Sequence, residues 1–229
     1  MSTPAATRAL QVLRLLSSGP LPASQVAERL AVPRASTYRL LEAMEHEGFV
    51  VRFPDDGRWG LGVATFEVGS AYLRRQPLER LARPILARLV VRTRRTAHLG
   101  ILLGPETLYL LVERPRRPDP LVTAVGVRLP AQHTASGRAI LAHLPEQQVR
   151  ATFSRGGVPA ELADLERDRV RGWSREDGLV TPGYGSVAAA VLDGSGRPVA
   201  AISVTARDGV TALVPEVRSA AATLAQRLA

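Results

Sequence analysis

The sequence predicts an α+β protein with two parts: a winged helix-turn-helix at the N-terminus and a larger mixed α/β domain after it. Three observations lead to this expectation. Three short amphipathic segments, separated by glycine and proline, fill the chain as far as Gly48. A hairpin pattern with a Pro-Asp-Asp-Gly turn follows directly. Beyond Pro77, aliphatic strand-like runs alternate with segments of helical spacing, as in a domain built on a mainly antiparallel sheet.

The first two helices are short and amphipathic. The first is expected over residues 8–16, with Thr7 as its N-cap, and residues 17–20 end it with Ser-Ser-Gly-Pro. Pro22 suits the first turn of the second helix, because proline is tolerated there. The apolar positions expected to face inward are Leu10, Val12, Leu13, Leu16, Val26, Ala27 and Leu30.

A third helix and a hairpin complete the N-terminal part. The helix is expected to open at Pro33 and to stop at Gly48, a natural C′ residue. Residues 49–53 and 58–61 read as two short strands, and residues 54–57 form the turn between them. Three helices followed by a small hairpin constitute a winged helix-turn-helix.

The rest of the chain is expected to begin with a linker helix and to enter the second domain at Gln76-Pro77. The predicted domains are residues 1–61, a linker at 62–76, and residues 77–229. The second domain combines helices with hairpin strands. Its expected strands cover residues 98–103, 107–113, 121–125, 186–192 and 198–205, and its expected helices cover residues 78–94, 136–143, 161–172 and 215–228.

Charge supports a polyanionic partner only weakly. The net charge is +9, and all 30 basic residues are arginine. Residues 1–75 contain nine arginines and seven acidic residues, whereas residues 76–229 contain 21 arginines and 14 acidic residues. Since the less charged part is the one with the helix-turn-helix pattern, the placement of its arginines has to carry the argument for nucleic-acid binding.

Composition also bears on the compartment. There are no cysteines, which excludes disulfides and thiolate metal sites. Residues 1–8 lack the apolar core of a signal peptide. No apolar run approaches the roughly 18 residues needed to cross a bilayer. We therefore expect a cytoplasmic protein with no membrane partner.

The third helix has the pattern of a DNA recognition helix. Spacing of 100° per residue puts Thr37, Leu40, Leu41 and Met44 on the side that packs inward. The outward side can enter a major groove, where Arg39 can pair with guanine and its neighbours can fix the register on phosphates. A solvated polar face is the alternative interpretation, and for Arg52 and Arg58 near the hairpin it is an equal one. The candidate DNA-binding residues are Arg34, Ala35, Ser36, Tyr38, Arg39, Arg52 and Arg58.

Motifs for catalysis or cofactors are weak throughout. No metal site is expected, because the four histidines lack metal-ligand spacing. No cofactor is expected either: the chain has no lysine for a phosphate-binding loop, and the glycine pattern at residues 183–188 leads into a strand rather than a helix. Ser136 lies near His133, but a serine at a helix start is usually a cap. No catalytic residue is therefore named.

Three function classes remain open at this point. The first is a ligand-responsive DNA-binding regulator. The second is a small-molecule enzyme with an accessory winged helix, which would need an activated nucleophile or paired carboxylates within residues 78–229. The third is a winged helix used for protein contacts.

The sequence resembles the IclR family of transcriptional regulators over nearly its whole length. No single motif decides this, but the matching motifs occur in the expected order. They are residues 9–16 for the opening helix, 26–30 and 32–41 for the helix-turn-helix, 47–50 and 58–62 for the wing and exit, and 129–142, 171–173 and 182–191 in the second domain.

The resemblance implies a fold, partners and a site. It implies a GAF-like second domain that binds a small organic acid or aromatic metabolite, and a homodimer on a double-stranded DNA operator, with a dimer of dimers as a further possibility. Each pocket residue has a structural alternative: Ser203 and Thr205 could form an ordinary polar face, and Glu176 could be a solvated turn residue. By matching positions, the effector pocket would use Ala135, Ser136, Glu176, Ser186, Ser203 and Thr205.

Overall fold

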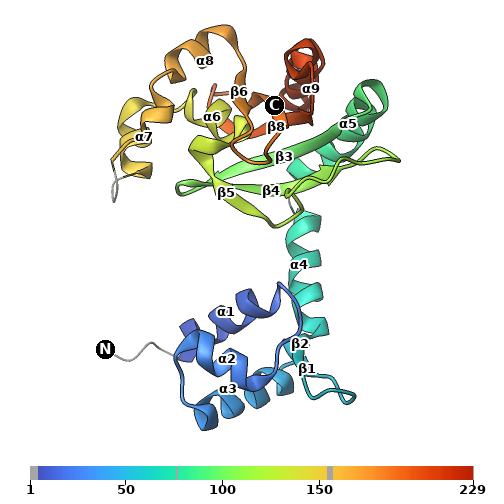
Figure 1. Ribbon diagram of the computed structural model, residues 1–229, viewed down its shortest axis with the longest axis vertical. Helices are drawn as coiled ribbons and strands as arrows, with labels where there is room; N and C mark the ends of the chain where they lie inside the picture. The colour runs from blue at the N-terminus through green and yellow to red at the C-terminus, as the bar shows by residue number, and fades with distance from the viewer. Residues whose placement is uncertain (1–4, 76, 154–156, 229) are drawn as a thin grey trace. The chain divides into compact units, whose positions relative to one another are not determined.

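A computed structural model describes residues 5–75, 77–153 and 157–228 (Figure 1). The chain divides into two compact units between Arg75 and Gln76. We call them the N-terminal unit and the C-terminal unit and describe each separately. Gln76, which the sequence analysis put at the end of the linker, lies outside the described residues.

The N-terminal unit consists of helices, a two-stranded hairpin and an exit helix. Positive φ angles end two of its helices: Ala31 has φ 51° after α2, and Gly48 has φ 72° after α3. The hairpin pairs Val50 with Leu61 and Arg52 with Trp59. The elements are α1 (Ala5–Leu16), α2 (Ala23–Leu30), α3 (Arg34–His46), β1 (Val50–Arg52), β2 (Trp59–Leu61) and α4 (Val63–Arg75).

One core holds these elements together. Trp59 is buried, and its backbone exchanges hydrogen bonds of 2.8 and 2.9 Å with Leu21, which joins the hairpin to the start of α2. The core side chains come from every element except α4, and one side of α3 is therefore fixed against the rest of the unit. They are Val12, Leu16, Ala23, Val26, Leu41, Met44, Val50 and Trp59.

Two details of the first helix differ from expectation. The helix α1 begins at Ala5, so Thr7 lies inside it and is not its N-cap. Leu10 was expected to face inward but is 61% exposed, whereas Val12 is fully buried. The reason is geometric, since two residues correspond to roughly 200° around a helix, which places Leu10 on the far side from Val12.

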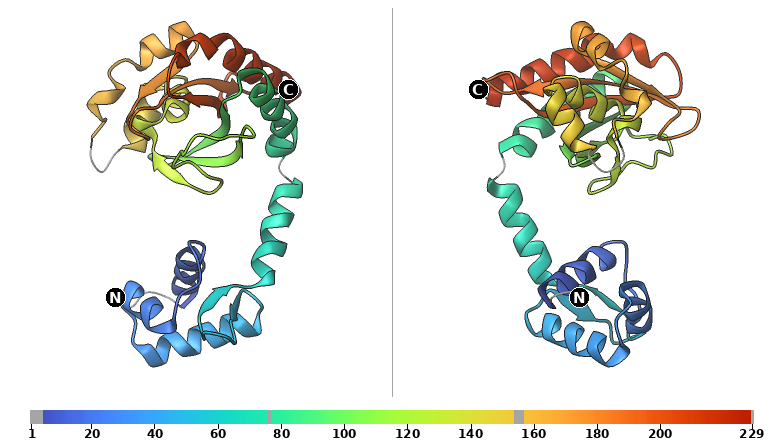
Figure 2. Two further views of the ribbon diagram at one scale, coloured as in Figure 1. Left: turned by 45° about the vertical axis from the view of Figure 1, so that its right-hand side comes forward. Right: turned by 90° about the vertical axis from the view of Figure 1, so that its left-hand side faces the viewer.

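The C-terminal unit is built on one six-stranded antiparallel sheet in the order β5-β4-β3-β8-β7-β6. Helices α5 and α9 pack together on one face, and α6 packs on the other (Figures 1 and 2). The strands are β3 (Thr96–Leu103), β4 (Glu106–Glu113), β5 (Arg128–Pro130), β6 (Ser174–Asp177), β7 (Gly185–Leu192) and β8 (Pro198–Ala206). The helices are α5 (Pro77–Thr93), η1 (Ala131–His133), α6 (Ala135–Leu141), α7 (Glu146–Thr152), η2 (Ala160–Leu162), α8 (Leu165–Arg171), η3 (Val210–Leu213) and α9 (Val214–Leu228).

The two faces of this sheet differ in chemistry. Leu99, Val187 and Ile202 point to the face covered by α5 and α9, where they form the main apolar core. Because side chains alternate along a strand, their neighbours His98, Ser186 and Ser203 point to the opposite face. That second face carries buried polar groups, and it is where the effector residues were expected.

The expected strand over residues 121–125 is wrong. The segment is a loop, with Val122 and Val125 exposed, and it turns at Gly126, which has φ 83°. Gly126 and Val127 form backbone hydrogen bonds with Tyr109 on β4, and the strand register starts at Arg128, opposite Leu108. β-branched residues suggested a strand here, but the ladder partner lies further along the chain.

The expected helix over residues 161–172 is also corrected. It is divided into η2 (Ala160–Leu162) and α8 (Leu165–Arg171). The short elements α7 and β6 were not foreseen.

No helix in the described part of the chain is long and apolar enough to cross a membrane.

Candidate functional site

The first candidate site is the outward side of α3. Arg34, Ala35 and Arg39 are exposed, Tyr38 is 43% exposed, and Ser36 is half-buried. On the other side Thr37, Leu41 and Met44 are buried, as the helical spacing predicted, and Leu40 packs at the edge of the same core. All five residues expected on the recognition helix thus lie on its exposed or partly exposed surface.

The start of α3 is open to an anion. Pro33 occupies the N-cap position with an extended ψ of 140°, and no side chain of the described residues caps the helix. The Pro33 carbonyl accepts from the Thr37 amide at 3.0 Å and from the Thr37 hydroxyl at 3.2 Å. Since the amides of the first turn have no partner within a helix, the positive end of the helix dipole is available to a phosphate.

The hairpin arginines differ in how they are held. Glu45 on α3 accepts a hydrogen bond of 3.1 Å from the Arg52 backbone amide, which ties β1 to the recognition helix. The Arg58 guanidinium forms an exposed ion pair of 3.2 Å with Asp56. Both arginine side chains are exposed, but the charge of Arg58 is partly compensated by its neighbour.

The second candidate site is the polar face of the C-terminal sheet. Strand register brings the expected residues together: Glu176 lies opposite Ser186, and Ser186 lies opposite Thr205. Residues paired across antiparallel strands share a face. Four of the six expected effector residues, Glu176, Ser186, Ser203 and Thr205, therefore line one connected surface.

A chain of hydrogen bonds ends at the Glu176 carboxylate. The Ser186 hydroxyl donates to Glu176 Oε1 at 2.6 Å, and the Leu179 amide donates to Glu176 Oε2 at 3.1 Å. Ser186 Oγ and Thr205 Oγ1 are 2.9 Å apart. Because Ser186 gives its single hydrogen to Glu176, Thr205 is the donor in that second bond. Burial raises the pKa of Glu176, and the Ser186 hydrogen bond opposes this shift.

Sequence reasoning missed a histidine on the same face. His98 is fully buried, and it lies directly opposite Ser203 on β8. Its Nε2 is 2.8 Å from the Thr123 hydroxyl, and its Nδ1 has no hydrogen-bond partner in the described residues. Burial, helped by the positive charge of Arg114, lowers the pKa of His98 to about 3. The imidazole is therefore neutral at physiological pH.

Tyr109 and Thr123 complete the surface. The Tyr109 ring centroid is 5.2 Å from that of His98, and burial together with the charge of Glu176 raises the pKa of Tyr109. Thr123 belongs to the loop that was expected to be a strand. In the sequence, the place of His98 on this face was indicated only by its position between apolar residues of a strand. That pattern could be interpreted only once the pairing of His98 with Ser203 was known.

The remaining expected residues sit at the start of α6. The Ser136 hydroxyl donates to Ser203 Oγ at 2.9 Å, and both residues are buried. Ala135 packs against Ala188 and Ala201 in a small apolar cluster. The Thr134 side chain caps α6 by accepting from the Gly137 amide at 2.9 Å.

The cavity on this face is closed. Its volume is about 10 Å³, which is room for no more than one water molecule. Its walls also show what closes it: the Tyr184 hydroxyl donates to Asp119 at 3.4 Å and accepts from Arg207 at 3.0 Å, joining two loops. A ligand has to separate those loops. The lining residues are Tyr109, Leu121, Thr123, Glu176, Val180, Thr181, Tyr184, Ser186 and Thr205.

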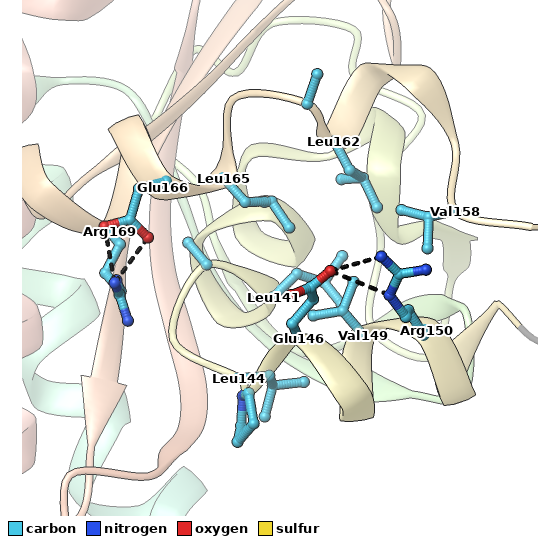
Figure 3. A pocket seen from close by; sticks show the side chains of 13 residues that line it. Leu141, Leu144, Glu146, Val149, Arg150, Val158, Leu162, Leu165, Glu166 and Arg169 are labelled. Atoms are coloured by element: carbon cyan, nitrogen blue, oxygen red, sulfur yellow. Dashed lines mark hydrogen bonds and ion pairs between the residues drawn. The ribbon is translucent and has the colours of Figure 1, made fainter.

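A wider cavity of about 610 Å³ lies among α6, α7 and α8 (Figure 3). Its floor is apolar, with Leu141, Leu162 and Leu165 pointing into it. The charged groups at its rim are paired with one another, Glu146 with Arg150 and Glu166 with Arg169. None of the residues expected to bind an effector lines it.

Neither unit presents a metal centre within the described residues: no group of three or more His, Asp or Glu side chains is placed to hold an ion. The Ser136 hydroxyl, the one candidate nucleophile discussed above, points to Ser203. Of the two surfaces, the exposed face of α3 offers arginine side chains to an anion, and the sheet face gathers hydroxyl, imidazole and carboxylate groups that form hydrogen bonds.

Comparison with known proteins matches both units. Residues 5–54 match the family model described as the IclR helix-turn-helix domain, and residues 70–225 match the bacterial transcriptional regulator IclR C-terminal domain. The transcriptional repressor IclR of Escherichia coli is 29% identical over 214 residues, which cover 87% of this chain and 78% of that protein.

Solved structures agree over the whole chain. The IclR structure from Thermotoga maritima superposes with a TM-score of 0.76 at 26% identity, covering 97% of this chain and 98% of that one. HmgR from Pseudomonas aeruginosa superposes with a TM-score of 0.81 at 26% identity, covering 98% of each chain. An IclR homolog from Microbacterium hydrocarbonoxydans, solved with 4-hydroxybenzoate, shares the fold with a TM-score of 0.85 at 24% identity and covers 98% of this chain and 99% of its own.

Three findings indicate the same family. They are the helix-turn-helix with the exposed side of α3, the sheet with its polar face, and the family matches over both units. The chain belongs to the IclR family of bacterial transcriptional regulators, with a DNA-binding N-terminal domain and an effector-binding C-terminal domain.

Proposed function

We propose that this protein represses or activates transcription by placing the outward side of α3 in the major groove of an operator. The observation that carries the proposal is the exposure of Arg34, Tyr38 and Arg39 on a helix whose opposite side is locked in the core. Arg39 reads a guanine edge, and Arg34, Ala35 and Ser36 approach phosphates at the open helix start. The relatives in Escherichia coli and Salmonella typhimurium carry the name repressor, which favours repression.

The hairpin arginines take a supporting role in this proposal. Arg52 contacts the DNA backbone, because its guanidinium is exposed and its strand is tied to α3 through Glu45. Arg58 contributes less, since Asp56 already pairs with it. Neither side chain is needed to select a sequence.

We infer that the effector binds on the polar face after the two loops joined by Tyr184 separate. An aromatic metabolite with a hydroxyl group fits the wall better than a simple acid does. Its hydroxyl would donate its one hydrogen to the Glu176 carboxylate or to Thr205 Oγ1, and Tyr109 would contact its ring. A carboxylate placed against Glu176 would be repelled. Ser136 and Ser203 hold α6 to the sheet beside the ligand, and Ala135 provides apolar packing.

The working assembly in this proposal is a homodimer. The N-terminal unit leaves large apolar side chains uncovered on α1 and α4, among them Leu10, Val63 and Phe66, the last 73% exposed. Burying such a surface against a second copy would stabilise a dimer and present two recognition helices to a pseudo-palindromic operator. Pairing of two dimers through the C-terminal units extends the same proposal, and the site of action is the cytoplasm, where bacterial operators are.

The protein acts by binding rather than by catalysis. An enzyme that used Ser136 as its nucleophile would need a base beside it, and the Ser136 hydroxyl instead donates to Ser203. The alternative function, in which the winged helix makes protein contacts, does not explain why the start of α3 is uncapped and carries exposed arginines.

The experiment is an anisotropy titration of labelled DNA from upstream of the protein's own gene, with an unrelated duplex as the control. The account expects saturable binding of the upstream DNA at least about tenfold tighter than the control, and two protomers per site. Equal affinity for both duplexes would refute the operator proposal and favour the protein-contact alternative.

A further inference from the structure

A further groove lies on the C-terminal unit, and none of its lining residues lines the cavity on the polar face. Its volume is about 660 Å³, within the range of small-molecule sites. It lies between the end of α5 and the loop that follows β4. The lining residues are Val90, Val91, Arg94, Arg114, Pro115, Arg116 and Arg117.

Four exposed arginines line this groove, and its lining includes no acidic residue. Within the described residues no ion pair joins Arg94, Arg114, Arg116 or Arg117 to an acidic group. The preceding carboxylate, Glu113, is already bonded to Arg83 at 3.1 Å. Like charges gathered without a partner repel one another, and a bound polyanion removes that repulsion.

Helix geometry explains only one of these cations. Arg94 follows the last residue of α5, where a positive charge favours the helix dipole, and it holds φ 55°, a conformation normally left to glycine. Arg114, Arg116 and Arg117 come from a loop and have no such reason to be there. Pro115, Pro118 and Pro120 stiffen that loop, so its backbone loses little freedom when an anion binds.

The same loop forms part of the effector cavity. Arg114 donates to the backbone carbonyl of Thr123 at 2.5 Å, and the Thr123 hydroxyl is bonded to His98 on the polar face. Leu121 and Thr123 line the closed cavity. Arg114 keeps other N–H donors for an anion while it holds this bond, so a bound anion would fix the guanidinium that positions Thr123.

We propose that the arginine groove is a second ligand site, which binds a free metabolite carrying two or more phosphate charges and stiffens the loop over the effector cavity. Phosphate suits the site because arginine forks bind its oxygens in bidentate fashion. Coupling of the two sites is reciprocal, so occupancy of either changes the affinity of the other. This site is separate from the DNA contact of α3, and it does not depend on the operator proposal.

Calorimetric titration of the full-length protein with inorganic pyrophosphate, at constant ionic strength, tests the site. We expect saturable binding that Arg116→Ser/Arg117→Ser weakens by at least about tenfold. The matched control, Arg150→Ser/Arg167→Ser, removes the same charge from arginines that are already paired with Glu146 and Asp164, and it should bind as wild type does. Absence of saturable binding to wild type, or equal losses in both variants, would overturn the proposal.

Two further measurements test whether the bound phosphate belongs to a free metabolite or to DNA, and whether the groove is coupled to the effector cavity. A short duplex of unrelated sequence that binds at the groove when pyrophosphate does not would refute a free metabolite in favour of DNA. Hydrogen–deuterium exchange over residues 119–127 should slow when pyrophosphate is bound to wild type, and unchanged exchange at saturation would overturn the coupling. Operator affinity measured on Arg116→Ser/Arg117→Ser should stay within about twofold of wild type, which separates this site from the function of α3.

Discussion

Ser186 and Glu176 lie directly opposite each other on β7 and β6, and the Ser186 hydroxyl donates to Glu176 Oε1 over 2.6 Å. This pair lies on the polar face of the C-terminal sheet. A buried carboxylate at that point contributes to the pH response of the C-terminal unit, and under the proposed function it also sets the hydrogen bonds that an effector has to match.

Glu176 should make the C-terminal unit less stable as pH rises. Its pKa is raised in the folded state by burial, so the folded protein binds more protons than the unfolded chain between the two pKa values, and stability falls with rising pH in that window. Urea unfolding from pH 4 to pH 8 should show this loss in wild type and a smaller one in Glu176→Gln. An identical pH profile in the two proteins would show that Glu176 is not desolvated.

His98 should act in the opposite direction. Its pKa is lowered from 6.5 to about 3, so below pH 6.5 the unfolded chain takes up a proton that the folded protein does not. Stability therefore decreases as pH falls from 6.5 toward 3, by up to about 1.4 kcal/mol per pH unit. His98→Gln should lose this slope. Retention of the full acid slope in that variant would assign it to other groups.

The Ser136–Ser203 hydrogen bond can be tested with a double-mutant cycle. Ser203→Ala removes the acceptor and leaves a buried hydroxyl donor at Ser136, which should cost about 1–3 kcal/mol of unfolding free energy. Ser136→Ala/Ser203→Ala should recover most of that loss, because two apolar groups replace the pair. Operator affinity without ligand should stay unchanged in both. Additive losses in the cycle would mean that the hydroxyls do not interact.

Leu41 tests the packing that positions the recognition helix. It is fully buried, and Leu41→Ala should destabilise the N-terminal unit by about 2–5 kcal/mol. In a Trp173→Phe background, the fluorescence of Trp59 reports that unit alone, since the chain has two tryptophans. A loss below about 1 kcal/mol would show that α3 is not held by this core.

Local signals in the sequence were enough for the helix-turn-helix. Pro33 and Gly48 bound α3 in the structure as they did in the pattern, because capping and termination depend on the nearest residues. The buried side of α3 also followed from its period alone. Leu10 was misplaced because its helix begins at Ala5 and because two residues along a helix point in nearly opposite directions.

Long-range pairing accounts for what the sequence could not show. The polar face of the C-terminal sheet forms because β8 lies between β3 and β7, which brings His98 opposite Ser203 and Ser186 opposite Thr205. Residues 121–125 have the composition of a strand yet cover a cavity as a loop, since β4 pairs with Arg128–Pro130 instead. Resemblance supplied four residues of the polar face, strand register adds His98 and Tyr109, and the Thr123 hydroxyl joins them through its contact with His98.

The most direct test of the account is the operator affinity of Arg39→Ala, measured by anisotropy with the upstream duplex. The matched control is Arg150→Ala, which removes an exposed arginine from α7, outside the recognition helix and the proposed dimer surface. We predict that Arg39→Ala loses roughly 1–3 kcal/mol of specific binding while its unfolding curve is unchanged, and that Arg150→Ala binds within about twofold of wild type. Unaltered operator affinity in Arg39→Ala would contradict the assignment of α3 as the helix that reads the DNA.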